Sequence, residues 1–148
     1  MIVPKILGIP DRALSSANEG GVSGAFANNV STLANALSAL NTDLGNRMGQ
    51  VTVVVMTEFG RRVKENASGG TDHGRGSAML AMGGNILGGK VYGAWPGLGA
   101  ASLDQGDLAV TTDFRNVLGE IVLKRLGNSR LDQVFPGFSV QSLGLAIG

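Results

Sequence analysis

The segment between positions 58 and 75 includes a cluster of six polar side chains that can act as acids, bases or ligands: Glu58, Arg61, Arg62, Asp72, His73 and Arg75. Glu58, Asp72 and His73 are of the types that bind a divalent cation. Arg61 or Arg75 could hold an anion through two parallel hydrogen bonds. Glycines at 69, 70, 74 and 76 would let backbone approach a ligand closely. The cluster predicts a metal or anion site, with an ordinary solvated surface loop as the alternative.

The composition restricts the chemistry that this cluster can perform. Among 148 residues there is no cysteine and one histidine, which excludes thiolate zinc sites, iron–sulfur clusters and centres that need two of the chain's imidazoles. The segment GGTDHGRG lacks the Lys-Ser/Thr ending of a Walker loop, and its glycines do not open a helix as a dinucleotide-binding motif requires. No G-x-S-x-G segment nominates a serine for a triad with His73. We therefore expect no organic cofactor.

Charge and hydropathy argue against two classes of partner. Twelve basic and eleven acidic side chains give a net charge of +1, which provides no broad positive surface for nucleic acid or anionic lipid. No apolar run reaches the roughly 18 residues of a membrane span. Two prolines and three charged residues among the first 14 positions are unlike the apolar centre of a signal peptide. We predict no nucleic acid partner, no membrane span and no signal peptide in this chain.

Two segments have the patterns of helices that could support the cluster. From Phe26 to Leu44, apolar residues recur at alternating steps of four and three, which predicts an amphipathic helix from about Gly24 to Arg47. Thr111-Thr112-Asp113 offers capping side chains ahead of a second apolar helical pattern, which begins at Phe114 and is closed by Gly127.

The intervening segments predict strands and loops. Residues 51–57, VTVVVMT, form a continuous β-branched run that is typical of a strand buried on both faces of a parallel sheet. Residues 77–82 predict a second short strand, and residues 90–92 the start of a third. Residues 63–77 show no periodicity and predict a loop, while residues 131–148 predict a strap lying on the body of the protein.

Together these elements predict an α/β fold with a mainly parallel sheet flanked by helices. We expect a single α/β domain in residues 25–148, preceded by an extended arm or tail in residues 1–24. Open α/β sheets bind their ligands at the carboxyl ends of the strands, and Glu58 directly follows the predicted buried strand. The strand end is therefore the first place to look for function.

Three ordered blocks of the sequence resemble one known family, the carboxyl-terminal part of the bacterial domain of unknown function 1501 family. The blocks are VTVVVMTEFGRRVKENASGGTDHGRGSAMLAMGGNILGGKVYGAWPGL, GDLAVTTDFRNVLGEIVLKRLG and VFPGF. The resemblance covers residues 25–138. Its members are longer, are typically exported through the twin-arginine route, and are regarded as distant relatives of the alkaline phosphatase and sulfatase superfamily. The resemblance implies a partial alkaline-phosphatase-like layered fold and an exported or periplasmic location.

The resemblance also implies roles for individual residues, with two alignments open. Superfamily hydrolases have a buried strand that ends in Ser-Asp-His-Gly, whose Asp and His bind metal. In the first alignment this element is Thr57-Glu58-Phe59-Gly60, where Glu58 could replace the Asp but Phe59 cannot bind a metal, and a later metal-binding His-Gly is His73-Gly74. In the second, Asp72-His73-Gly74 is itself the Asp-His-Gly element, so that Asp72 and His73 are both ligands.

Other parts of the hydrolase pattern have no counterpart in this chain. Residues 1–24 contain no Asp-Thr-His or similar segment for the nucleophile and the first metal-binding acids, and one imidazole with few carboxylates cannot build a two-metal centre alone. The resemblance therefore implies an incomplete site for zinc, manganese or calcium, and no catalysis by the chain alone. An active form would be a metal-dependent phosphate- or sulfate-ester hydrolase.

A half-domain would expose a sheet edge and apolar surface. We therefore expect self-association or association with a missing amino-terminal half. The alternative function is that of a non-catalytic structural or self-assembly module, in which the glycine-rich turns and the apolar tail make subunit contacts.

Overall fold

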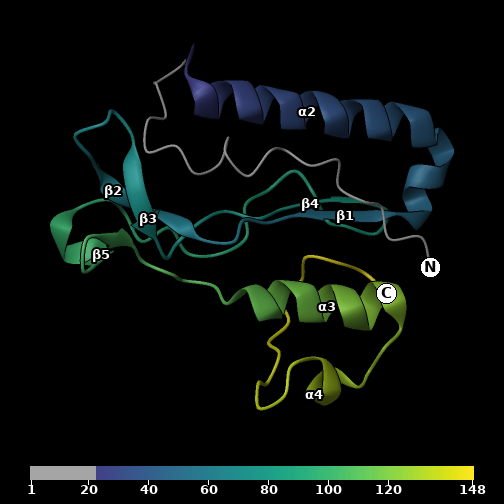
Figure 1. Ribbon diagram of the computed structural model, residues 1–148. Helices are drawn as coiled ribbons and strands as arrows, with labels where there is room; N and C mark the ends of the chain where they lie inside the picture. The colour runs from purple at the N-terminus through teal and green to yellow at the C-terminus, as the bar shows by residue number, and fades with distance from the viewer. Residues whose placement is uncertain (1–22) are drawn as a thin grey trace.

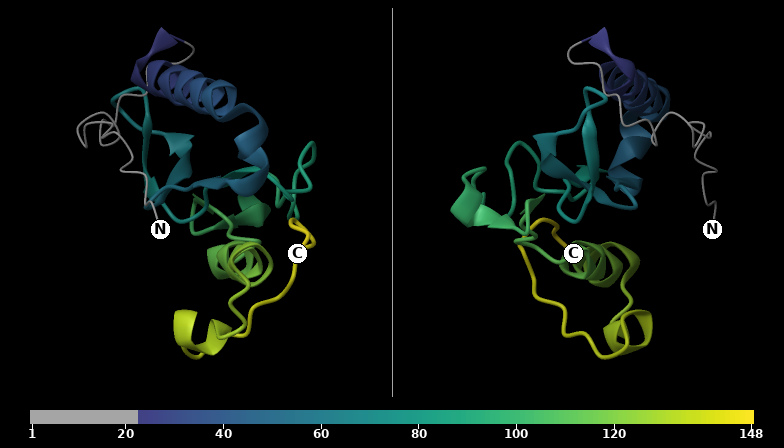
Figure 2. Two further views of the ribbon diagram at one scale, coloured as in Figure 1. Left: turned by 90° about the vertical axis from the view of Figure 1, so that its right-hand side faces the viewer. Right: turned by 60° about the vertical axis from the view of Figure 1, so that its left-hand side comes forward.

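The computed structural model describes residues 23–148, so the arm expected at residues 1–24 lies almost wholly outside the described residues. The helices are α2 (Ala25–Leu44), α3 (Phe114–Leu126) and α4 (Leu131–Val134), with 3-10 turns η2 (Gly45–Gln50) and η3 (Ala100–Ser102). The strands are β1 (Thr52–Val55), β2 (Gly60–Glu65), β3 (Thr71–Gly74), β4 (Leu80–Gly83), β5 (Leu103–Asp104) and β6 (Asp107–Leu108). Figures 1 and 2 show α2 on one side of the β1–β4 pair and α3 on the other.

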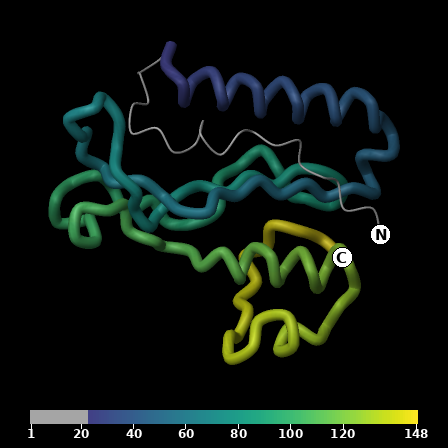
Figure 3. Tube along the Cα trace, in the orientation of Figure 1, coloured from purple at the N-terminus to yellow at the C-terminus, as the bar shows by residue number. Residues whose placement is uncertain are grey.

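All the described strand pairs are antiparallel, so the predicted mainly parallel sheet is wrong. Strands β1 and β4 form a two-stranded sheet, and the remaining strands form a second sheet in the order β3-β2-β6-β5. A parallel pair needs a crossover connection of about a dozen or more residues, whereas residues 66–70 alone join β2 to β3. Short connections join β2 to β3 and β5 to β6, whereas β1 and β4 pair across the intervening β2–β3 hairpin. The result is a mixed α/β fold with two small antiparallel sheets (Figure 3).

The strand at the start of the valine run is confirmed, but its surroundings differ from the expectation. The strand β1 covers Thr52–Val55, and every residue in it is half-buried instead of fully buried. Its partner β4 overlaps the strand predicted at residues 77–82. The loop predicted at residues 63–77 is wrong, because much of it forms the β2–β3 hairpin. Residues 90–92 lie in a loop and not in a strand.

The helix predicted from the apolar stripe is confirmed as α2, which ends at Gly45 with a positive φ of 48°. No side chain of this helix is buried. Within the stripe, Phe26, Val30 and Leu40 are 60%, 47% and 38% exposed. The apolar stripe of α2 is therefore only partly covered by the described part of the chain.

The second predicted helix is also confirmed, together with its caps. Helix α3 begins after Asp113, whose side-chain oxygen accepts a hydrogen bond from the Arg115 N–H at 2.9 Å. It ends at Gly127, which has the left-handed φ of 64° that glycine adopts without strain. Its Ile121 side chain is buried with Leu145 and Ala146 from the carboxyl-terminal tail. The small core therefore lies between α3 and the tail, against the β1–β4 layer.

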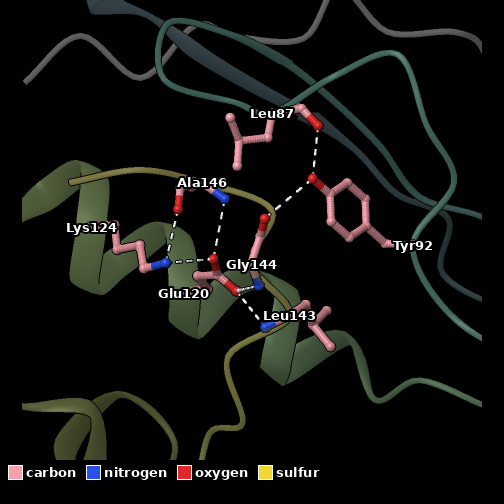
Figure 4. Close-up of polar contacts among 7 residues, drawn as sticks. All are labelled: Leu87, Tyr92, Glu120, Lys124, Leu143, Gly144 and Ala146. Carbon is pink, nitrogen blue, oxygen red and sulfur yellow. Dashed lines mark hydrogen bonds and ion pairs between the residues drawn. The ribbon is translucent and has the colours of Figure 1, made fainter.

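A buried carboxylate ties this tail to α3 (Figure 4). Glu120 is 2% exposed, and its Oε2 accepts hydrogen bonds from the N–H groups of Leu143 at 2.6 Å and Gly144 at 3.0 Å. Its Oε1 accepts from the N–H of Ala146 at 3.1 Å and from Lys124 Nζ at 2.9 Å. Burial alone would raise the pKa of Glu120, but the Lys124 ammonium and the amide donors outweigh it and lower the pKa to about 2.

The tail in turn is paired with the segment that follows β4. Ile86 and Ala146 form an antiparallel bridge, flanked by hydrogen bonds from Leu87 N–H to Leu145 O at 2.8 Å and from Ile147 N–H to Asn85 O at 2.9 Å. The predicted strap is thus bonded to α3 through Glu120 and to residues 85–87 through its own backbone. In addition, no helix among residues 23–148 has the length and apolar character needed to cross a bilayer.

The low pKa of Glu120 predicts how the stability of the fold depends on pH. Its folded pKa lies below the reference value of 4.5, so its carboxylate contributes stability above about pH 4.5 that is lost as the pH falls toward 2. Glu120→Gln should lower the free energy of unfolding at pH 7 by roughly 3 kcal/mol, because it breaks a buried ion pair. The difference between mutant and wild type should shrink toward pH 2. Urea unfolding at several pH values measures both quantities.

Glu65→Gln provides the matched control, because Glu65 is exposed near the end of β2. It should change stability by less than about 0.5 kcal/mol at each pH. A Glu120→Gln effect that is equally large at pH 7 and pH 2 would contradict the role given to the carboxylate.

Candidate functional site

The candidate residues lie on and around the β2–β3 hairpin, which leads away from the end of β1. Glu58 lies in the connection between β1 and β2, Arg61 lies on β2, and Asp72 and His73 lie on β3. The antiparallel register places Arg61 directly opposite His73. The fold therefore brings two of the predicted site residues to neighbouring positions, although they are twelve positions apart in the sequence.

An aromatic stack lies at the centre of this group. The rings of Phe59 and His73 are stacked, with centroids 3.9 Å apart and an interplanar angle of 29°. The guanidinium carbon of Arg61 lies 5.5 Å from the centroid of the Phe59 ring, which is within the range of a cation–π contact. Phe59, which cannot bind a metal, thus positions the imidazole of His73 through ring contact.

Glu58 and His73 are the two candidate ligands that remain available. Both are exposed, and neither side chain makes a hydrogen bond or an ion pair within residues 23–148. Glu58 precedes Phe59 in the chain, and the His73 ring stacks on the ring of Phe59. A carboxylate and an imidazole with free ligand atoms are compatible with binding a cation from solvent.

Asp72 has a different environment from its neighbour His73. Its Oδ1 accepts a hydrogen bond from Asn66 Nδ2 at 2.9 Å. Because successive side chains of a strand point to opposite faces, Asp72 and His73 lie on opposite faces of β3. The Asp72 carboxylate therefore acts in the hairpin turn, away from the face that carries the imidazole.

The guanidinium groups are engaged in contacts within the second sheet. Arg61 donates to Thr71 O at 2.8 Å, and Arg75 pairs with Asp104 Oδ2 at 2.9 Å. Arg62 Nε lies 3.4 Å from Asp107 Oδ1. Exposed ion pairs of this kind stabilise a protein by about 0–1 kcal/mol, so an incoming anion could displace Arg75 from Asp104 at modest cost.

Two of the glycines near the cluster are required by the chain itself. A Cβ atom on Gly74 would overlap the backbone of Arg61, and one on Gly76 would overlap the carbonyl oxygen of Leu108. These glycines allow β2, β3 and β6 to pack closely, which is a structural reason for their presence next to His73. At Gly74 and Gly76 the close approach is therefore to another strand of the protein, and not to a ligand as the sequence suggested.

The donor set does not form a complete metal centre. Within residues 23–148 no group of three or more His, Asp or Glu side chains is close enough together to hold a metal ion. A two-metal centre like that of the superfamily hydrolases therefore does not fit the described residues.

Sequence reasoning missed Glu120, the acidic group whose pKa departs most from its ordinary value. A signal was present, because Glu120 lies on the apolar side of α3 beside Val117 and Ile121, with Lys124 four positions later. All the hydrogen-bonding partners of its carboxylate belong to α3 and the tail. Its role is thus structural.

Asn66 is a second residue that the sequence analysis did not identify. Its side chain stabilises the turn between β2 and β3. Its Oδ1 accepts from the N–H groups of Ser68 at 2.9 Å and Gly70 at 3.2 Å.

Asn66→Ala should therefore lower the free energy of unfolding by roughly 1–2 kcal/mol and increase amide exchange at Gly70. Hydrogen exchange and urea unfolding measure the two effects. Ser68→Ala is the control, because Ser68 uses its backbone N–H; an equal loss in both variants would contradict this role.

Comparison with known proteins gives a family and no closer relative. The sequence model of one family, described as a protein of unknown function (DUF1501), matches residues 20–118, about two thirds of the chain. Searches of curated proteins and of solved structures found no match. The matched range contains the whole candidate cluster, from Glu58 to Arg75. The chain therefore belongs to the DUF1501 family, whose function is unknown.

Proposed function

We propose that the chain is the carboxyl-terminal part of an alkaline phosphatase/sulfatase-like domain and carries an incomplete ligand site. In this proposal Glu58 and His73 bind a divalent cation, and Arg61 or Arg75 holds an anionic group beside it. Asp72, which the resemblance to the hydrolases also nominates as a ligand, stabilises the hairpin turn through Asn66. The chain does not catalyse a reaction by itself.

The observation that carries the proposal is the pair of available donors around Phe59. Glu58 and His73 are exposed and make no polar contact within residues 23–148, whereas Asp72, Arg62 and Arg75 all have partners there. Two ligands leave most of the coordination sphere of a cation to water or to another chain segment, and this favours weak binding.

The proposal implies a reaction class for the complete domain. A bound divalent cation would supply Lewis-acid activation of a phosphate or sulfate ester. Within this chain, Arg61 or Arg75 would orient the charged oxygens of the ester, and Phe59 would hold the His73 ring in place. The remaining ligands and the nucleophile would come from an amino-terminal half. An exported location in bacteria belongs to the same proposal.

Titration calorimetry with zinc, manganese and calcium tests the site. We expect weak binding of at least one ion, and a loss of at least about tenfold in affinity for His73→Ala and for Glu58→Gln, because each variant removes one of the two ligands. Asp72→Asn is the matched control and should bind as the wild type does. The absence of binding to the wild type, or identical binding to His73→Ala, would refute the proposal.

A second candidate function, a self-assembly module, is favoured by the small size of the core. Among the described residues the buried apolar side chains are Met48, Ile121, Leu145 and Ala146. Large apolar side chains are exposed elsewhere, including Val91 at 95% and Trp95 at 71%. Exposed apolar surface beyond a few scattered residues marks protein interfaces. This distribution supports association with a second copy.

Light scattering coupled to size-exclusion chromatography tests the second candidate. Self-assembly predicts a mass above that of one chain, 15.1 kDa, which rises with protein concentration over a roughly hundredfold range. A mass that stays at one chain over the whole range would contradict it.

A further inference from the structure

We infer that two copies of this chain associate through the open edge of β1, which pairs antiparallel with β1 of the second copy. The inference rests on the self-assembly candidate above and names its interface. The product is a continuous four-stranded sheet in the order β4-β1-β1-β4.

Within residues 23–148, β1 pairs with β4 and with no other strand. Its residues, Thr52, Val53, Val54 and Val55, are uncharged and β-branched, a composition typical of strands with neighbours on both edges. Natural edge strands are protected by charges, prolines or bulges, and β1 contains no charge and no proline. In the other sheet, by contrast, both edge strands carry a carboxylate: Asp72 in β3 and Asp104 in β5.

The hydrogen-bond pattern identifies the backbone groups that face the open edge. The register of β1 and β4 pairs Thr52 with Gly83, and one step further it places Val51 opposite Gly84. The Gly84 N–H donates to Val51 O at 3.1 Å, so this pair is a hydrogen-bonded one. Such pairs alternate along an antiparallel ladder, so Val53 faces β4 with its backbone groups, while Thr52 and Val54 face the open edge.

Because the backbone groups of Thr52 and Val54 face the open edge, this edge of β1 can pair with the same edge of a second copy. Under a two-fold axis, Thr52 of each copy lies opposite Val54 of the other, and each such pair exchanges two hydrogen bonds. Val53 then lies opposite Val53 of the second copy in a non-hydrogen-bonded position, where the two Cα atoms are about 4.5 Å apart. Because β1 is uncharged, pairing it with itself places no charge of the strand at the interface.

The surroundings of β1 are compatible with this pairing. The Thr52 side chain accepts a hydrogen bond from Arg125 Nε at 3.0 Å, which fixes the start of the strand to α3 and leaves the Thr52 backbone available. Strand pairing alone buries less than the roughly 800 Å² per partner of a stable interface. Helix α2 lies over the β1–β4 pair in Figure 1, and its exposed apolar side chains are available to add to the contact surface.

Cysteine cross-linking tests the register, because the natural chain contains no cysteine. Val53→Cys places the two thiols opposite each other, within the Cα separation of about 4.4–6.8 Å that a disulfide allows. Val55→Cys is the matched control on the same face of the same strand. Its two copies lie four residues out of register, roughly 13 Å apart. Under mild oxidation, Val53→Cys should form the cross-linked dimer at least about tenfold faster than Val55→Cys, and denaturant should abolish the difference.

The possible results test the β1 interface and the self-assembly candidate separately. A concentration-dependent dimer together with selective cross-linking at position 53 supports both. A dimer in which positions 53 and 55 cross-link equally, or in which neither does, overturns the β1 interface and leaves self-assembly standing. A chain that remains monomeric in light scattering, with no selective cross-link, overturns both.

Discussion

The buried carboxylate of Glu120 is the contact on which the arrangement of the described layers depends. It accepts hydrogen bonds from three amide groups of the tail and from Lys124, so the tail cannot leave α3 without losing three hydrogen bonds to a charged group. The tail pairs with residues 85–87 just after β4, and Arg125 bonds α3 to the start of β1. One charged group therefore joins the only well-buried cluster of the described residues to the strand layer.

In one part of the protein the segments supply one another with hydrogen-bonding and packing partners, and in another part strand and helix surfaces remain exposed. The tail, α3 and the segment after β4 satisfy one another, while the outer edge of β1 and the apolar stripe of α2 do not have comparable partners in residues 23–148. The β2–β3 hairpin is held independently by Asn66 and by the pairing of Arg75 with Asp104. It carries the available donor His73, with Glu58 close by in the chain. The proposed cation site and the proposed self-association surface of this DUF1501 protein therefore lie on different elements.

Local signals predicted the two long helices, because their formation follows periodicity and capping, but not the short α4 within the predicted strap. The stripe from Phe26 to Leu44 and the Asp113 cap correspond to α2 and α3. The antiparallel pairing could not be predicted, because a run of β-branched residues favours a strand but does not set the direction of its neighbours. The β2–β3 hairpin escaped notice since its residues are polar and its turn depends on the Asn66 side chain. Glu120 escaped notice because its three amide partners are more than twenty residues away in the sequence.

The central claim is that Glu120 fixes the tail, and amide hydrogen exchange followed by NMR tests it most directly. The account predicts that the amides of Leu143, Gly144 and Ala146 are protected to the same extent as those in the middle of α3, because they open only when the buried carboxylate loses its partners. Exchange of these three amides at the rate of an unstructured chain, while α3 stays protected, would contradict the account.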